Sequence, residues 1–142
     1  MSSLCCDMTK TLYPKVIKMK HHEYYIYITT NPSRTTLYIG MTNDIARRMI
    51  EHYANRGKPE TFAGRYYCYC LVYLEMFQYV NNAIERETEL KDWRRELKNQ
   101  LITEFNPKWK FLNAEWCGEW PPKEIWGDYY HILRVAAPTK LP

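Results

Sequence analysis

Five side chains in this sequence have types that suit the hydrolysis of a phosphodiester bond. The set contains two tyrosines, an arginine, a histidine and a glutamate: Tyr27, Tyr38, Arg48, His52 and Glu87. The reaction needs a base for the attacking water, a cation for the negative charge that develops at phosphorus, and a carboxylate that holds a metal ion. Other catalytic patterns are missing, because the chain has no glycine-rich phosphate loop, no nucleophile elbow and no His-Glu-x-x-His sequence.

The two tyrosines fall in segments whose pattern predicts a β-hairpin. Glu23–Thr30 and Thr35–Gly40 alternate in polarity and are rich in β-branched and aromatic residues. Between them, the sequence Asn31-Pro32-Ser33-Arg34 has the composition of a turn. Both tyrosines are therefore expected on adjacent antiparallel strands.

The register of this hairpin follows from where the turn is centred. Centring it between residues 32 and 33 gives four cross-strand pairs, Ile28–Leu37, Ile26–Ile39, Tyr27–Tyr38 and Tyr25–Gly40. One face of the hairpin is then aliphatic and covers a core. Tyr27 and Tyr38 are expected side by side on the opposite surface.

Three further segments complete the predicted fold. They are a helix over Asp44–Ala54, a third strand over Arg65–Glu75 and a long helix over Ala83–Phe105. Helical spacing places Arg48 and His52 on one flank of the first helix. The order of these segments predicts one small α/β domain, a three-stranded sheet flanked by helices.

Glu87 stands within the apolar stripe of the long helix, three positions from both Ile84 and Leu90. A carboxylate on an inward helix face is costly unless it is paired or bound to a metal ion. Two interpretations stay open at this point. Glu87 is either a ligand for a cation or a structural glutamate paired with Arg86 or Arg94.

The sequence resembles the GIY-YIG nuclease superfamily, and in particular its small stand-alone bacterial members, from about residue 24 to residue 116. Tyr25-Ile26-Tyr27 stands at the first motif, and Tyr38-Ile39-Gly40 is the second motif unaltered. Arg48 and His52 follow the second tyrosine by ten and fourteen positions, which is similar to the family pattern. The segment that ends at Glu87 resembles the helix that carries the family's metal-binding glutamate.

The resemblance implies an endonuclease that hydrolyses DNA with one divalent metal ion, Mg²⁺ or Mn²⁺, held by Glu87. By the same resemblance, Tyr27 would help to deprotonate the attacking water, aided by the metal, His52 or Tyr38. Arg48 would stabilise the developing negative charge. A catalytically inactive GIY-YIG-like module that binds nucleic acid is the alternative.

Two positions depart from the pattern of repair-type relatives. Met41 stands where those relatives carry a lysine near the active site. Lys110 stands where they place a late asparagine, and Asn113 is a poor substitute for it. Base activation and the fine geometry of the metal are therefore expected to differ in this chain.

Composition and patterning also predict the domain boundaries and the location of the protein. We expect a GIY-YIG domain over residues 21–116, a flexible N-terminal extension over 1–20 and a C-terminal extension of unknown role over 117–142. No apolar run is long enough for a membrane helix and no secretory signal is visible, so we expect a cytoplasmic protein with DNA as its partner and no membrane.

The composition also bears on the form of the DNA. A net charge of +4 is too small to be a nucleic-acid footprint by itself. The 13 tyrosines and 5 tryptophans permit stacking on unpaired bases, which is compatible with a single-stranded or branched substrate. The sequence leaves the oligomeric state open.

Overall fold

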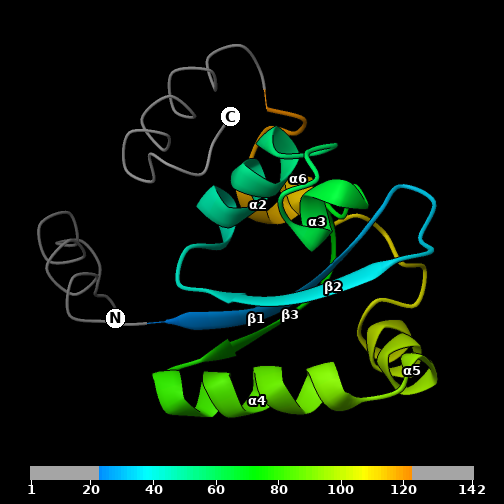
Figure 1. Cartoon of the computed structure of the whole chain (residues 1–142). Coiled ribbons are helices and arrows are strands. Elements are labelled where there is room, and N and C mark those ends of the chain that lie inside the picture. Colours follow the sequence, from blue (N-terminus) through cyan, green and yellow to red (C-terminus); the bar gives the residue numbers. More distant parts are fainter. Residues whose placement is uncertain (1–22, 123–142) are drawn as a thin grey trace, which may run out of the picture.

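The computed structural model describes residues 23–122 and contains a three-stranded antiparallel sheet with helices on both faces (Figure 1). The strands stand in the order β2-β1-β3. In chain order the elements are β1 (Tyr24–Thr30), β2 (Leu37–Thr42), α2 (Ile45–Ala54), α3 (Phe62–Arg65), β3 (Cys70–Phe77), α4 (Val80–Asp92), α5 (Arg95–Phe105) and α6 (Asn113–Cys117). The predicted α/β class and the three-stranded sheet are confirmed.

The predicted hairpin register is wrong by two residues. Tyr27 lies opposite Gly40, and Tyr38 lies opposite Thr29. The reason is the turn, whose centre lies later in the chain because the Asn31 side chain accepts hydrogen bonds from the backbone N–H groups of residues 35 and 36, at 2.8 and 3.0 Å. A shift of two residues preserves the faces, since side chains alternate with a period of two. Tyr27 and Tyr38 therefore still share one face of the sheet.

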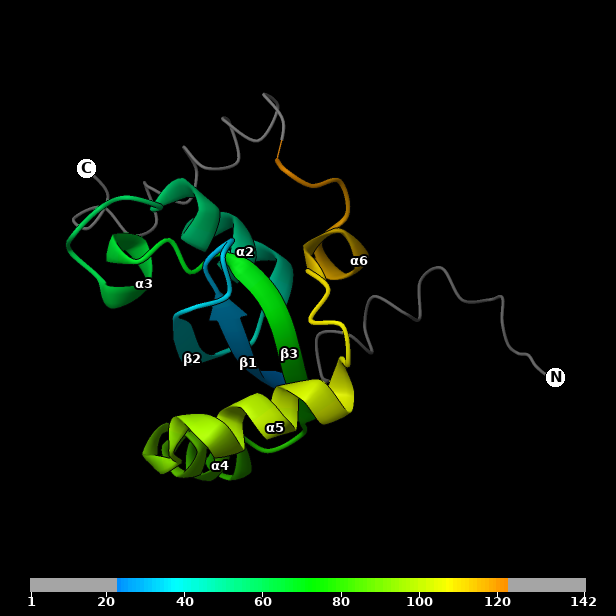
Figure 2. The ribbon, with the colours of Figure 1, turned by 90° about the vertical axis from the view of Figure 1, so that its right-hand side faces the viewer.

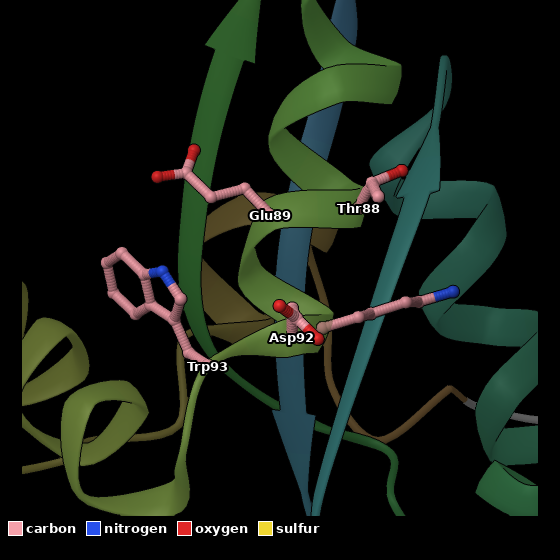
Figure 3. Close-up of a pocket in the computed structure, with 5 residues that line it drawn as sticks. Thr88, Glu89, Asp92 and Trp93 are labelled. Atoms are coloured by element: carbon pink, nitrogen blue, oxygen red, sulfur yellow. The ribbon is translucent and has the colours of Figure 1, made fainter.

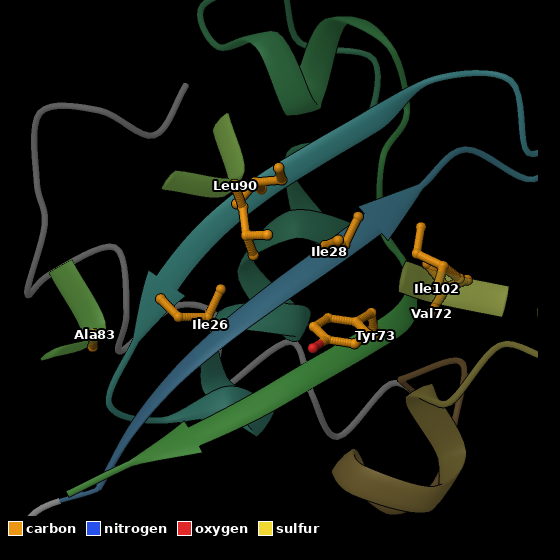
Figure 4. Packing of buried hydrophobic residues seen from close by; sticks show 8 residues of the cluster. Ile26, Ile28, Val72, Tyr73, Ala83, Leu90 and Ile102 are labelled. Atoms are coloured by element: carbon orange, nitrogen blue, oxygen red, sulfur yellow. The ribbon is translucent and has the colours of Figure 1, made fainter. Parts of the chain in front are cut away.

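The aliphatic face of the sheet is covered by α4 and α5 (Figures 1 and 2). Ile26 and Ile28 of β1 and Val72 of β3 pack there against Leu90 of α4 and Ile102 of α5 (Figure 4). All five side chains are buried. This core fixes which face of β1 is left for its tyrosines.

The tyrosine face is covered as well, by α2, α3 and α6 (Figures 1 and 2). Tyr27 is fully buried there and packs in a second core with Met49 of α2 and Leu71 of β3. The expectation that both tyrosines lie on an open surface is therefore wrong for Tyr27. A second helical layer closes over it, and Tyr38 keeps part of its surface exposed.

The predicted long helix is broken at Trp93 and Arg94, whose backbones are extended at ψ 151° and 160°. A continuous helix over residues 80–105 would be about 39 Å long at 1.5 Å per residue. The eight-residue strand β3 spans only about 26 Å. The break turns α5 across the direction of α4 (Figures 1 and 2), and Ile102 reaches the same core as Leu90.

The third strand begins five residues later than predicted, at Cys70, because residues 62–65 form the short helix α3. The free edge of β3 is capped by two asparagine side chains. Asn113 accepts from the backbone N–H of Leu71 at 2.8 Å, and Asn106 donates to the carbonyl of Val72 at 3.1 Å. Asn113 is therefore held as a structural residue.

The predicted N-terminal extension and residues 123–142 of the predicted C-terminal extension lie outside the described residues. Within residues 23–122, no helix is long and apolar enough to cross a membrane.

Candidate active site

Helix α2 delivers Arg48 and His52 to the buried tyrosine. The helix starts at Asp44, whose side chain accepts from the backbone N–H of Arg47 at 3.1 Å and so caps the first turn. Arg48 and His52 are four residues apart and therefore project from the same side of the helix. This side faces Tyr27, which comes from the central strand of the sheet.

Tyr27, Tyr38, Arg48 and His52 form one group of contacts, which we call the Tyr27 cluster. Arg48 Nε donates to Tyr27 Oη at 3.2 Å, and Tyr27 Oη lies 2.9 Å from His52 Nε2. Arg48 can only donate, and the tautomer of His52 sets the direction of the second contact. We assign the tautomer in which Tyr27 donates its proton to His52 Nε2, because this arrangement also uses the hydroxyl proton. His52 is then neutral and carries its proton on Nδ1.

Burial favours the same protonation states, a protonated Tyr27 and a neutral His52. It lowers the pKa of His52 from 6.5 to about 3, and the positive charge of Arg48 adds to this shift. Burial also raises the pKa of Tyr27 above its usual 10, although Arg48 opposes this shift. At neutral pH the pair is therefore a protonated phenol and a neutral imidazole.

Arg48 keeps its charge and is held in a fixed direction by Glu51. Burial alone would lower the pKa of Arg48, but the neighbouring Tyr27 and Glu51 outweigh it and the pKa is raised. Arg48 Nη1 donates to Glu51 Oε1 at 2.7 Å, a charge-assisted hydrogen bond within one turn of α2. The guanidinium is partly exposed and therefore presents a positioned positive charge at the edge of the cluster.

Gly40 is the residue of the second motif on which Tyr27 rests. A Cβ atom at this position would lie 2.6 Å from Cζ of Tyr27 and 3.0 Å from Cε2 of Tyr38. No side chain fits there without displacing the ring of Tyr27. The motif glycine is therefore required by close approach and not by a left-handed backbone conformation.

Tyr38 joins the buried part of the cluster to the surface. Its ring centroid lies 5.4 Å from that of His52 and 6.3 Å from that of Tyr27. On its other side it stacks on Phe62 of α3, with centroids 6.4 Å apart and planes inclined by 25°. Tyr38 is thus the partly exposed phenol of the cluster.

Glu87 lies apart from these residues. It belongs to α4, which packs on the other face of the sheet, and no hydrogen bond or ion pair within residues 23–122 connects it to the Tyr27 cluster. Its side chain is 22% exposed, and its Oε2 accepts an ion pair from Lys91 Nζ at 3.1 Å. In the alternative of a structural glutamate, the expected partner was Arg86 or Arg94. Within the described residues the partner is Lys91, and Arg86 binds Glu75 and Glu89.

Lys91 also lines an open hollow on α4, together with Thr88, Glu89, Asp92 and Trp93 (Figure 3). Within the described part of the chain, no three His, Cys, Asp or Glu side chains come together as a group that could hold a metal ion. A zinc-type site with three or four protein ligands is therefore not formed there. The one carboxylate of Glu87 fits Mg²⁺, which is commonly bound by one or two carboxylates, several waters and substrate phosphates.

Of the two departures from the repair-type pattern, Met41 is partly buried and packs against the aliphatic core. It therefore supplies no charge to the Tyr27 cluster. Both ends of the Asn113 amide bind the backbone at the start of β3. Its Oδ1 accepts from the N–H of Leu71, and its Nδ2 donates to the carbonyl of Tyr69 at 2.9 Å.

Sequence reasoning did not identify Gly40, Glu51 and Phe62 as parts of the site. For Glu51 a signal was present, because it stands three residues after Arg48 on the same helix. For Gly40 the signal was its place in the second motif, although the close approach of Tyr27 that explains it crosses the sheet. The role of Phe62 depends on a contact from α3, for which a single sequence contains no local signal.

Comparison with known proteins agrees with the motifs and the fold. The profile of the GIY-YIG catalytic domain matches residues 23–101. The chain therefore belongs to the GIY-YIG family.

Among curated relatives, the chain is similar to UPF0213 proteins. One from Haloquadratum walsbyi is 41% identical over 81 residues, which cover 57% of this chain and 88% of the relative. Another from Staphylococcus saprophyticus is 38% identical over 82 residues, covering 58% and 96%. A third from Bacillus pumilus is 33% identical over 87 residues, covering 61% and 86%. No solved structure matches this chain significantly.

Proposed function

We propose that this chain is an endonuclease that hydrolyses DNA phosphodiester bonds and depends on a divalent metal ion. Membership of the GIY-YIG family supports a nuclease-type function in general terms. The observation that carries the finer proposal is the double contact of Tyr27 Oη, which receives the Arg48 Nε–H and lies within hydrogen-bond distance of His52 Nε2.

This contact provides a route for a proton and a stabiliser for the charge left behind. The proton leaves Tyr27 Oη for His52 Nε2, and Arg48 stabilises the phenolate that results. Since burial raises the pKa of Tyr27 and lowers that of His52, this transfer is unfavourable in the free protein. We infer that the transfer takes place when the substrate is bound. The attacking water would give a proton to Tyr27 Oη as Tyr27 passes its own proton to His52 Nε2, so that the proton of the water ends on His52 and the hydroxide attacks phosphorus and displaces the leaving oxygen.

The cluster is arranged in two levels relative to the surface. Arg48 and Tyr38 are partly exposed, whereas Tyr27 and His52 are buried beneath them. We assign the contact with the phosphodiester to Arg48 and Tyr38, and the acceptance of the proton to the pair below. Arg48 then acts as a preorganised charge for the transition state.

Glu87 is the residue to which we assign the metal ion. Its side chain is partly exposed, and among residues 23–122 its ion-pair partner is the exposed Lys91. Mg²⁺ or Mn²⁺, when bound, supplies Lewis-acid stabilisation of the charge on a phosphate oxygen.

The alternative function, a nucleic-acid-binding module without catalysis, is favoured by one observation. Glu87 is paired with Lys91 and lies on the other side of the sheet from Tyr27. In this alternative the ion pair is permanent and the protein binds DNA without cleaving it.

A cleavage assay separates the two functions. End-labelled single-stranded, duplex and forked oligonucleotides are incubated with the protein in Mg²⁺, in Mn²⁺ and in EDTA. The endonuclease proposal predicts internal cleavage of at least one of these DNA forms that EDTA abolishes. Binding without cleavage in both metals would support the inactive module.

A further inference from the structure

Two exposed aromatic rings continue the Tyr27 cluster onto the surface. Phe62 and Tyr66 of the α3 region are 49% and 43% exposed, and their centroids lie 4.8 Å apart. Phe62 stacks on Tyr38, which itself contacts His52. We call Tyr38, Phe62 and Tyr66 the aromatic platform, because together they form an unbroken series of rings from the cluster to solvent.

The backbone beneath the platform is held firmly. Gly57 N–H donates to the carbonyl of Gly64 at 2.8 Å, and Thr61 Oγ1 accepts from Gly64 N–H at 3.0 Å. Gly64 is packed closely against the preceding loop, since a Cβ there would lie 2.7 Å from the carbonyl oxygen of Asn55. The backbone that carries the two rings is therefore held in place, which lowers the entropic cost of binding a flat ligand.

The surroundings of the platform favour nucleic acid over another protein surface. Residues 55–67 contain Arg56, Lys58 and Arg65 against Glu60, which gives three positive charges minus one negative charge, a local net charge of +2. Two half-exposed rings also provide far less apolar area than the roughly 1,000 Å² that a stable protein interface needs. Flat rings with nearby positive charge are the combination that binds unpaired nucleobases and their phosphates.

We propose that the aromatic platform stacks an unpaired base next to the phosphodiester to be cleaved, and so selects single-stranded DNA. In a duplex, both faces of each base are already covered by neighbouring bases, so the platform has nothing to stack on. This inference rests on the proposed function for the position of the cleaved bond. The stacking itself requires only that single-stranded DNA is bound.

The test measures binding in EDTA, where no metal-dependent cleavage can take place. The probe is a short single-stranded oligonucleotide with 2-aminopurine, whose fluorescence is quenched when it stacks on an aromatic ring. Phe62→Ala should weaken binding by about 5- to 150-fold, the range expected for the loss of one stacking contact, and should abolish the protein-dependent quenching. Phe62→Trp should keep both.

Tyr79→Ala is the matched control, because Tyr79 is 63% exposed and lies at the start of α4, outside the platform. It should bind the single strand like the native chain. Binding of a duplex of the same sequence should not change in Phe62→Ala. The proposal is overturned if the native chain does not bind the single strand, if folded Phe62→Ala binds it normally, or if Phe62→Ala weakens single-strand and duplex binding equally.

Cleavage is measured separately, so that the two proposals can fail independently. Quenching that depends on Phe62 in a protein that cleaves nothing would contradict the nuclease and support the platform. Metal-dependent cleavage that is equally fast in Phe62→Ala and in the native chain on single strands would contradict the platform and support the nuclease.

Discussion

The neutral state of His52 makes the stability of the fold depend on pH in a way that can be calculated. In the unfolded chain a histidine has a pKa of about 6.5, whereas burial and Arg48 lower the pKa of folded His52 to about 3. Lowering the pH from 7.5 to 5.0 therefore protonates this histidine in the unfolded state only. The free energy of unfolding falls, because the unfolded state takes up a proton that the folded state does not.

The size of the effect is set by the distance between the unfolded pKa and the working pH. At pH 5.0 that distance is about 1.5 pH units, and 1.36 kcal/mol per unit gives about 2 kcal/mol. The stabilisation of the fold by the neutral His52 is fully present above pH 6.5. As the pH is lowered below 6.5, this stabilisation falls until the pH reaches the pKa of the folded histidine. In a chain of this size, 2 kcal/mol corresponds to a decrease of roughly 8 °C in Tm.

Urea unfolding at the two pH values tests this prediction, with His52→Gln as the reference. The glutamine cannot titrate, and it offers a carbonyl oxygen as an acceptor for the hydroxyl of Tyr27. The native chain should lose about 2 kcal/mol more than His52→Gln between pH 7.5 and pH 5.0. Because the other titrating groups are the same in both proteins, their contributions cancel in the difference. Equal losses would show that His52 titrates normally, and they would refute the assignment of a neutral, buried imidazole.

Three further predictions concern the cluster and the metal ligand. Arg48→Ala should lower the single-turnover cleavage rate by about 10²-fold or more, and Arg47→Ala by much less, since only Arg48 contacts Tyr27; equal losses would indicate a general basic patch. Gly40→Ala should lower the free energy of unfolding in urea by about 1–3 kcal/mol and also slow cleavage, because the new methyl group displaces the ring of Tyr27; a folded variant with native stability and rate would contradict the close contact. Glu87→Gln should abolish metal-dependent cleavage, keep DNA binding and change Tm little, because its ion-pair partner Lys91 is exposed; cleavage by a well-folded Glu87→Gln protein would contradict the metal assignment.

The hairpin illustrates what the sequence can and cannot determine. Alternation assigns Tyr27 and Tyr38 to one face whatever the register, because the period of a strand is two. The register itself depends on side-chain capping by Asn31, which moves the centre of the turn by one residue and the pairing by two. A turn composition alone does not distinguish these two positions.

The two larger errors come from tertiary packing. The break at Trp93 and Arg94 contains neither glycine nor proline, and its result is tertiary: Leu90 before it and Ile102 after it pack in the same core. The burial of Tyr27 depends on α2, which covers the second face of the sheet. Periodicity indicates which residues share a face, but it does not indicate how many layers cover that face.

The candidate site was predictable to different degrees in its two parts. Motif spacing brought together Tyr27, Tyr38, Arg48 and His52, and the structure places these four in contact. Glu87 was selected by its position in an apolar stripe, and its ion pair with Lys91 is a contact that the stripe does not indicate. Its role as a metal ligand stays a prediction.

The most direct test of the proposed chemistry is the removal of one oxygen atom from the centre of the cluster. Tyr27→Phe keeps the ring that fills the core above Gly40 and removes only the hydroxyl that Arg48 and His52 share. The measurement is the single-turnover rate of cleavage of a single-stranded oligonucleotide in Mg²⁺, with binding in EDTA as the control and circular dichroism to establish that the variant is folded. The account predicts a loss of about 10²-fold or more in rate, with binding unchanged. A folded Tyr27→Phe protein that cleaves at the native rate would contradict it.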